Sequence, residues 1–259
     1  MANDITSDDN CICLWRFESG SMLVDEQGND DLTLSGEWAP PLEDTTVYHE
    51  GGCSAKFTDG LEYPYVIEDY NQSAEFPLKW DDGEGTKTTF SWVAWIYPTD
   101  YAGDRPIFGR MILNGNGDDM CVFIKSDTDT IGFIIWDDKV DSGIEIAYDA
   151  WNHIGITHDT ETQTLTMRVY NESTGIADTY QTSMTGGHLV EVTSAPWAIG
   201  NYNEEGDLRV DEVAVFDDVL SVAEIDQIRA GTFGSGGGGG ATGQAVLDDY
   251  TSLQLGCPF

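Results

Sequence analysis

Apolar and polar residues alternate along most of the chain, in short runs rich in β-branched and aromatic side chains. A period of two places successive side chains on opposite faces, so this alternation predicts strands. Turns rich in Gly, Asn and Asp separate the runs, which indicates a sandwich or barrel rather than βαβ units. The predicted strands are 11–17, 32–34, 54–57, 63–67, 89–97, 107–110, 121–125, 131–136, 144–148, 151–157, 165–170, 179–183, 197–199 and 210–216.

The strand 89–97 carries large side chains on both of its faces. Trp92 and Ile96 fall on one face, and Trp95 and Tyr97 fall on the other. A strand that is apolar on both faces must be covered on both, so we expect it in the middle of its sheet.

One short helix is predicted near the end of the chain. Ser221 and Glu224 have the spacing of a capping box, and Gly231 suits the left-handed position that follows a helix. Between them, apolar residues recur at helical spacing, at Val222, Ile225 and Ile228. We expect this helix on the rim of the sandwich.

Composition divides the chain into an N-terminal arm (1–10), a main domain (11–231) with a long insertion (70–87), a glycine-rich linker (232–243) and a tail (244–259). The tail is too short for a core of its own, so it docks on this domain, docks on a neighbouring subunit or stays mobile. We favour the neighbouring subunit. The apolar centre of the insertion likewise suits a contact with another subunit or with the tail.

Charge narrows the possible partners. The chain has 11 Lys and Arg against 47 Asp and Glu, a net charge of −36. Such a field repels phosphate backbones and anionic lipids, so nucleic acid and membrane surfaces are excluded as partners. Cations, neutral ligands and basic proteins remain possible as binding partners. Hydrophobic residues make up 40% of the chain, which argues against disorder.

No membrane insertion or Sec export is expected. No apolar run approaches the roughly 20 residues that span a bilayer, and the first residues include no basic or apolar segment. The five cysteines form no CxxC, so neither a zinc site nor a redox motif is predicted. We interpret the cysteines as small buried hydrophobic residues. Because their number is odd, at least one thiol is free or is paired with a cysteine of another chain.

Four groups of motifs occur in a fixed order. They read LWRF (14–17) with DEQGN (25–29), TFSWVAWIYP (89–98), WNHIGIT (151–157), and VDEVAVF (210–216) with LSVAEI (220–225). This order resembles the laminin-G-like branch of the concanavalin A-like lectin/glucanase family over roughly 11–231. The resemblance implies an all-β, two-sheet antiparallel jelly-roll sandwich with one short C-terminal helix and an extended tail. Members of this branch also occur among bacteriophage virion proteins.

The resemblance also implies a structural calcium ion. In the family, calcium often ties the opening turn to the aspartate of the closing strand, and the matching residues here are Asp25, Asn29 and Asp211. Carboxylate and carbonyl oxygens are the ligands that Ca²⁺ prefers. The alternative is that Asp25 caps a turn and Asp211 is solvated. A second acidic segment, 114–119, lacks the closing Glu of a calcium loop and reads as a hairpin loop.

No catalytic residue and no cofactor-binding residue is assigned. Glucanases of this fold use acids in an E-x-D-x-E arrangement on one strand, whereas the nearest pair here, Glu145 and Asp149, lies four residues apart. No G-x-S-x-G occurs, and His153 falls in a strand as a structural residue. Three aromatic residues near loops could serve as sugar platforms, although packing is the favoured role, namely Trp80, Trp136 and Tyr202.

The sequence therefore predicts a non-enzymatic structural or adhesion protein of a virion or another extracellular assembly. Its tail would mediate contacts between subunits, and its loops would be available to contact surface glycans. The alternative is a stand-alone calcium-dependent carbohydrate-binding module. A glycan hydrolase or lyase is the third and weakest hypothesis.

Overall fold

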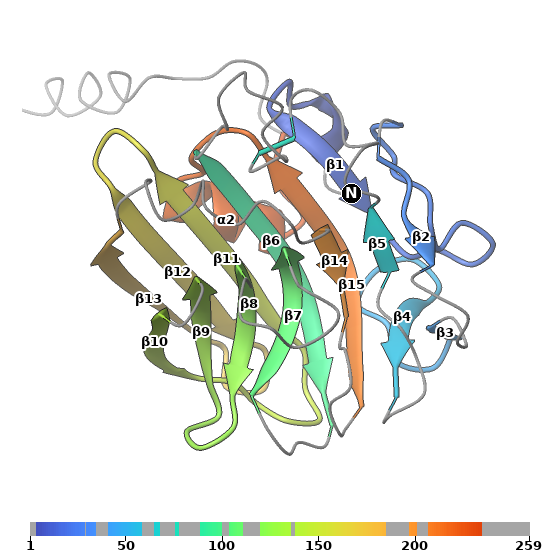
Figure 1. Ribbon diagram of the computed structural model, residues 1–259. Coiled ribbons are helices and arrows are strands. Elements are labelled where there is room, and N and C mark those ends of the chain that lie inside the picture. The colour runs from blue at the N-terminus through green and yellow to red at the C-terminus, as the bar shows by residue number, and fades with distance from the viewer. Residues whose placement is uncertain are drawn as a thin grey trace, which may run out of the picture.

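The computed structural model describes residues 4–28, 30–34, 41–58, 65–67, 76–77, 89–99, 104–110, 120–135, 138–184, 197–200 and 207–234. Within them the chain forms two antiparallel sheets and one α-helix (Figure 1). The elements are η1 (Ile5–Ser7, a single 3-10 turn), β1 (Cys11–Trp15), β2 (Thr33–Leu34), β3 (Leu42–Asp44), β4 (Ser54–Phe57), β5 (Tyr65–Ile67), β6 (Phe90–Pro98), β7 (Arg105–Arg110), β8 (Met120–Lys125), β9 (Thr130–Ile135), β10 (Asp138–Glu145), β11 (Asn152–Asp159), β12 (Thr164–Asn171), β13 (Ile176–Ser183), β14 (Trp197–Ile199), β15 (Leu208–Phe216) and α2 (Val222–Arg229).

The two sheets confirm the predicted jelly-roll sandwich. One has eight strands in the order β13-β12-β11-β6-β15-β4-β3, with β1 also paired to β15. The other has seven, in the order β10-β9-β8-β7-β14-β5-β2. Every pairing in both sheets is antiparallel, and the elements next to each other in space are often far apart in sequence.

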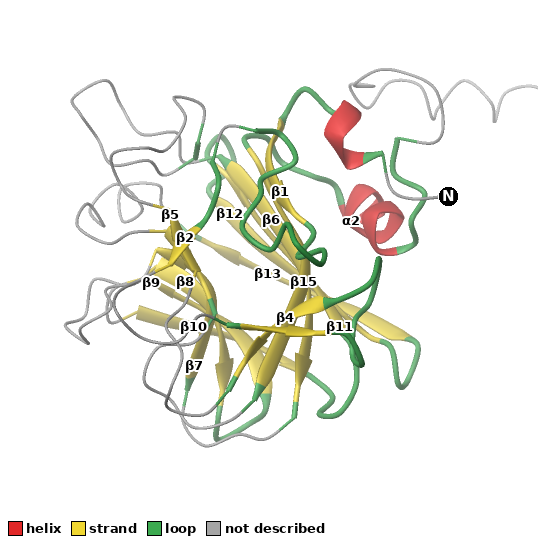
Figure 2. Cartoon of the chain, turned by 90° about the vertical axis from the view of Figure 1, so that its right-hand side faces the viewer, coloured by secondary structure: helices red, strands yellow, loops and turns green. Residues whose placement is uncertain are grey.

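The main core lies between the two sheets (Figure 2). As predicted, β6 is central: it pairs with β11 on one side and β15 on the other. Residues of β6 alternate between the two faces of the sheet. Trp92 lies on the inner face, in the core, where it meets Trp197 edge to face at a centroid distance of 6.1 Å. Trp197 in turn stacks on Trp15 at 5.2 Å. Three fully buried tryptophans from β1, β6 and β14 therefore tie the two sheets together.

A second, smaller core covers the outer face of the eight-stranded sheet. Ile225 and Ile228 of α2 pack there with Val93 and Phe216. Gly155 of β11 makes room for the helix, because a Cβ at that position would lie 2.6 Å from Cγ2 of Ile225. The expectation of a rim position for the helix was therefore wrong: α2 lies against the sheet, on the side away from the main core (Figure 2).

The capping box at the start of α2 is present. Ser221 Oγ accepts a hydrogen bond from Glu224 N at 3.2 Å, and Glu224 Oε2 accepts one from Ser221 N at 2.7 Å. Gly231 follows the helix with φ +68°, the left-handed conformation expected of it.

Replacing Ser221 with alanine removes the acceptor for one amide at the start of the helix. We expect Ser221→Ala to lower the free energy of unfolding by about 1 kcal/mol in urea titrations. Ser221→Asp is the matched control, because its carboxylate can accept the same bond and should retain most of the stability. Equal losses in both variants would show that the cap contributes nothing.

Most predicted strands lie within a few residues of the observed ones, with two differences. The strand β3 was missed, because its three residues lack β-branched side chains. The strand predicted at 144–148 lies earlier, as β10, whose pairing with β9 shifts register between Asp141 and Glu145. Alternation cannot indicate where such an irregularity falls.

The described parts of the predicted arm and linker are packed on the domain. Ile5 is fully buried, Phe233 is 6% exposed, and the amide of Asp4 donates to the carbonyl of Phe233 at 3.2 Å. The tail, segment 114–119 and the aromatic candidates Trp80, Trp136 and Tyr202 lie outside the described residues. No helix in the described part of the chain is long and apolar enough to cross a bilayer.

Candidate functional site

The first predicted ligand, Asp25, lies in the turn that follows β1 and is 2% exposed. Its Oδ1 accepts hydrogen bonds from the amides of Leu14 (2.8 Å) and Gln27 (3.0 Å), and its Oδ2 accepts one from the amide of Asp30 (3.1 Å). Asp25 therefore organises its own turn and attaches it to β1. This is the turn-capping role that the sequence left open as an alternative.

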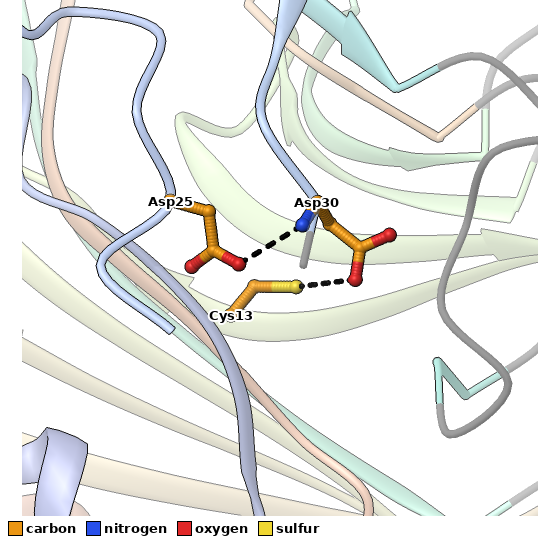
Figure 3. A group of neighbouring side chains, drawn as sticks. All are labelled: Cys13, Asp25 and Asp30. Atoms are coloured by element: carbon orange, nitrogen blue, oxygen red, sulfur yellow. Dashed lines mark hydrogen bonds between the residues drawn. The ribbon is translucent and has the colours of Figure 1, made fainter. Parts of the chain in front are cut away.

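Around Asp25 the fold gathers a buried cluster with Cys13 and Asp30. One potential ligand atom of each residue lies within 4.8 Å of the others (Figure 3). The Cys13 thiol donates to Asp30 Oδ2 at 3.4 Å (Figure 3). Burial, followed by the charges of Asp25 and Asp30, raises the pKa of this thiol well above its ordinary value. The thiol is therefore the donor in its hydrogen bond with Asp30.

These donors fit calcium in part. Asp25 and Asp30 supply the carboxylate oxygens that Ca²⁺ prefers, whereas a protonated thiol is a poor ligand for a hard cation. Calcium takes six to eight oxygens, so other oxygens would have to complete the set. Asn29, the second predicted ligand, lies outside the described residues. The calcium ion stays a prediction.

The third predicted ligand, Asp211, is fully buried on β15 and is not solvated. Its Oδ2 accepts from the amides of His49 (2.8 Å) and Glu50 (3.2 Å), which attaches the loop before β4 to the sheet. Its Oδ1 accepts from the amide of Glu212 at 3.0 Å. Among the described residues, the three-member cluster that gathers around Asp25 does not include Asp211.

Glu212 beside it was not predicted. It sits at the register shift in β15 with φ +50°, so both neighbouring acids are buried. Glu212 Oε2 accepts from Arg16 Nη1 at 2.6 Å. Burial raises the pKa of Asp211 to about 7 and that of Glu212 to about 8, although the amides and Arg16 act in the opposite direction. Of the two adjacent carboxyls, Glu212 thus joins the closing strand to Arg16, just after β1, and Asp211 joins it to the loop before β4.

An aromatic layer lies next to this acidic pair, on the outer face of the eight-stranded sheet. The His49 ring stacks on Trp95 with centroids 3.5 Å apart, and Trp95 also meets His153 edge to face at 5.0 Å. Trp95 and His153 are 4% and 1% exposed, and burial lowers the pKa of His153 to about 3. His153 is therefore a neutral, structural histidine in this layer, which is packed rather than open to a ligand.

The nearest sequence pair to a glucanase arrangement does not share a strand. Glu145 ends β10 in the seven-stranded sheet, whereas Asp149 lies in the turn before β11, with its amide bonded to the Pro98 carbonyl. Asp149 has φ +53°, which is typical of a turn residue. The paired carboxylates of a retaining glucanase instead project from one strand about 5–5.5 Å apart.

A two-sheet antiparallel jelly roll with a helix on its outer face defines a domain of the lectin and glucanase type. The chain belongs to the concanavalin A-like lectin/glucanases superfamily, whose family model matches residues 72–226. No curated protein matches the chain.

Solved structures share the fold at low sequence identity. The binding domain of Paraclostridial Mosquitocidal Protein 1 is 15% identical with a TM-score of 0.58, over 87% of this chain and 52% of that one. The binding domain of botulinum neurotoxin DC, solved with rat synaptotagmin II, is 11% identical with a TM-score of 0.54, over 88% and 52%. Trypanosoma rangeli sialidase, solved with sialic acid, is 14% identical with a TM-score of 0.53, over 85% and 32%. This chain thus spans about half of the two toxin domains and a third of the sialidase.

Proposed function

We propose that this protein is a non-enzymatic adhesion domain that recognises a surface glycan or glycosylated receptor. The observation that carries the proposal is its jelly roll, shared with domains named for binding. One of these, from botulinum neurotoxin DC, has been solved with SialylT as well as with synaptotagmin II. Since a shared fold does not fix a ligand, the class of glycan is left to the experiment.

The acidic pair of the closing strand supports the non-enzymatic role. A glycoside hydrolase needs two carboxyl groups that reach the substrate. Asp211 and Glu212 are the adjacent carboxyls of β15, and both are buried and engaged with backbone amides or Arg16. Their oxygens are thus used in contacts within the domain, with the amides of His49, Glu50 and Glu212 and with the Arg16 guanidinium.

A glycan array probed with the full chain tests this function. We expect retention on a subset of surface glycans and no release of product when the same glycans are incubated with the protein. Turnover on any of them would favour the hydrolase or lyase hypothesis. Absence of binding across the array would contradict glycan recognition.

We further propose that the protein acts within a virion or another extracellular assembly, through its tail. The packing of Phe233 on the outer core shows where a truncation should fall, because cutting before it would expose Phe216. Light scattering should therefore compare the full chain with a chain ending at Gly234. We expect a larger particle for the full chain. Monomers in both samples would instead favour the stand-alone calcium-dependent module.

If calcium is held near Asp25, its removal should destabilise the opening turn. We expect EDTA to lower the melting temperature by several degrees and added Ca²⁺ to restore it, because the ion offsets repulsion between Asp25 and Asp30. Asp30→Asn should abolish the response. Asp159→Asn, at the end of β11, is the matched control and should retain it. An unchanged melting temperature in EDTA would remove calcium from the proposal.

A further inference from the structure

The loop 45–52, between β3 and β4, follows the surface of the domain and contributes one ring to the aromatic layer. Its residues are exposed or half-buried, and Tyr48 is 42% exposed. His49 points inward, and its ring lies flat on Trp95, with the centroids 3.5 Å apart and an angle of 16° between the planes. Trp151 meets the His49 ring edge to face at 5.8 Å. Because Trp95 is 4% exposed beneath this ring, removing the imidazole would uncover the face of the indole.

The same loop also occupies the carboxylate beside Trp95. Asp211 lies opposite Trp95 in the pairing of β15 with β6, and residues opposite each other in an antiparallel pair lie on the same face of the sheet. Asp211 Oδ2 accepts hydrogen bonds from the amides of His49 (2.8 Å) and Glu50 (3.2 Å). The loop therefore brings two things to this part of the sheet, a flat ring and a pair of neighbouring hydrogen-bond donors.

A pyranose ring offers the same combination. One face of the sugar is made of C–H groups that stack on an indole, and hydroxyl groups on adjacent carbons are neighbouring donors that one carboxylate can accept. Asp211 is fully buried, so its Oδ2 needs new donors whenever the loop leaves. A ligand that supplies only a ring would leave this oxygen unsatisfied, whereas a pyranose with adjacent hydroxyls replaces both contributions of the loop.

We propose that Trp95, Trp151 and Asp211 form a binding site for an uncharged pyranose with hydroxyls on adjacent carbons, and that the loop 45–52 closes this site with His49. The sugar and the loop compete for the same indole face and the same carboxylate. An anionic sugar is disfavoured by Asp211 itself and by the net charge of −36. This assignment rests on the glycan recognition proposed above, to which it adds the class of sugar and the way in which the site is closed.

Two features of the loop favour its local opening. Its residues bury little surface, and segments of that kind open without unfolding of the whole domain. In the closed loop, His49 Nδ1 is buried and has no hydrogen-bond partner among the described residues, so opening lets water satisfy it. Gly52 is attached to Glu18 Oε2 by an amide bond of 3.0 Å. Gly51, at φ +66°, lies between this anchor and His49 and can absorb the change in backbone angles.

Titration calorimetry on the full chain tests the site, with methyl α-D-mannopyranoside and methyl β-D-galactopyranoside as probes. A closed loop weakens the apparent affinity by the fraction of molecules that are open. We expect His49→Gly, which removes the ring and loosens the loop, to bind at least one probe about tenfold more tightly than the natural chain. Tyr48→Gly is the matched control, because it loosens the same loop but leaves the ring on Trp95, and it should gain far less. Equal affinities of His49→Gly and the natural chain would overturn the proposal, as would no binding of either probe to His49→Gly.

Hydrogen exchange on the natural chain is a second measurement that does not depend on the folding of a variant. A bound ligand usually slows exchange near its site, whereas a sugar that displaces the loop should speed it there. We expect the amides of His49 and Glu50 to exchange faster as the tighter probe is added, while those of β6 do not. If a glycan from the array binds and these two amides keep their protection, the site proposed here is wrong and glycan recognition stands. If the array and both probes show no binding, both proposals fail.

Discussion

Replacing Arg209 with methionine is expected to lower the free energy of unfolding by about 3–5 kcal/mol, because it leaves a buried carboxylate without its partner. Arg209 Nε lies 2.9 Å from Asp44 Oδ2, and the two side chains are 10% and 9% exposed. Asp44 Oδ1 separately accepts from Thr46 and Val47. The ion pair joins β15 to β3, at the edge of the sheet.

Two controls make the expected result specific. Arg209→Met combined with Asp44→Asn should lose less than the single variant, since no uncompensated charge remains. Lys125→Met breaks partly exposed pairs with Asp141 and Asp127 and should cost under about 1 kcal/mol. Unfolding in guanidinium chloride measures the loss in free energy of unfolding for all three variants. A single-variant loss as small as that of Lys125→Met would show that water already screens the Arg209 pair.

The same pair has a pH signature. Burial alone raises the pKa of Asp44, but the hydrogen bonds from Thr46 and Arg209 outweigh it and hold the pKa below its ordinary value. A lowered pKa contributes stability above the unfolded value near 4, and this stability is lost as the pH falls through the folded value. The difference in the free energy of unfolding between the natural chain and Arg209→Met should therefore be largest at neutral pH and should shrink below about pH 4. A difference that is constant from pH 7 to pH 3 would contradict this account.

Replacing Trp92 with alanine should be as costly, about 3–5 kcal/mol, because it empties the centre of the main core. Trp92 is fully buried and meets Phe90, Phe108 and Phe133 at centroid distances of 4.4, 5.9 and 6.0 Å. The loss would be measured as a shift of the midpoint in chemical denaturation.

The variant Trp92→Phe distinguishes the contribution of the buried aromatic ring from that of the indole N–H. The Trp92 Nε1 is buried and has no hydrogen-bond partner among the described residues, so phenylalanine removes an unsatisfied donor along with part of the ring volume. We expect this variant to lose much less stability than Trp92→Ala. Equal losses would mean that Nε1 makes a bond in solution, for example to a buried water.

The fold could be predicted from the sequence because its main signals are local. The alternation in β6 placed Trp92 and Trp95 on opposite faces, and the capping box located α2 at its first residue. The position of α2 on the outer face could not be predicted, since it depends on Gly155, a residue distant in sequence whose missing side chain makes room for Ile225. Local patterns specify elements, whereas contacts between distant elements decide their packing.

The candidate site was predictable only in part. Asp25 was identified through its motif, and its turn-capping contacts are of the kind that an aspartate before a glycine turn forms. Cys13 reads as one more apolar strand residue, so its place beside Asp30 carried no signal. Glu212 was missed because a register shift turns it inward, and strict alternation would have left one of the two neighbouring acids outside.

The contact between residues near the two ends of the described chain has a consequence for how this domain can be combined with others. Because the Asp4 amide meets the Phe233 carbonyl, anything that precedes residue 4 and anything that follows residue 234 leaves the sandwich from nearly one place. A host protein could therefore carry the domain within one of its own surface loops, with little strain at the two junctions. The same proximity suits circular permutation: a short peptide could join these points, and new ends could be opened in an exposed hairpin such as 172–175.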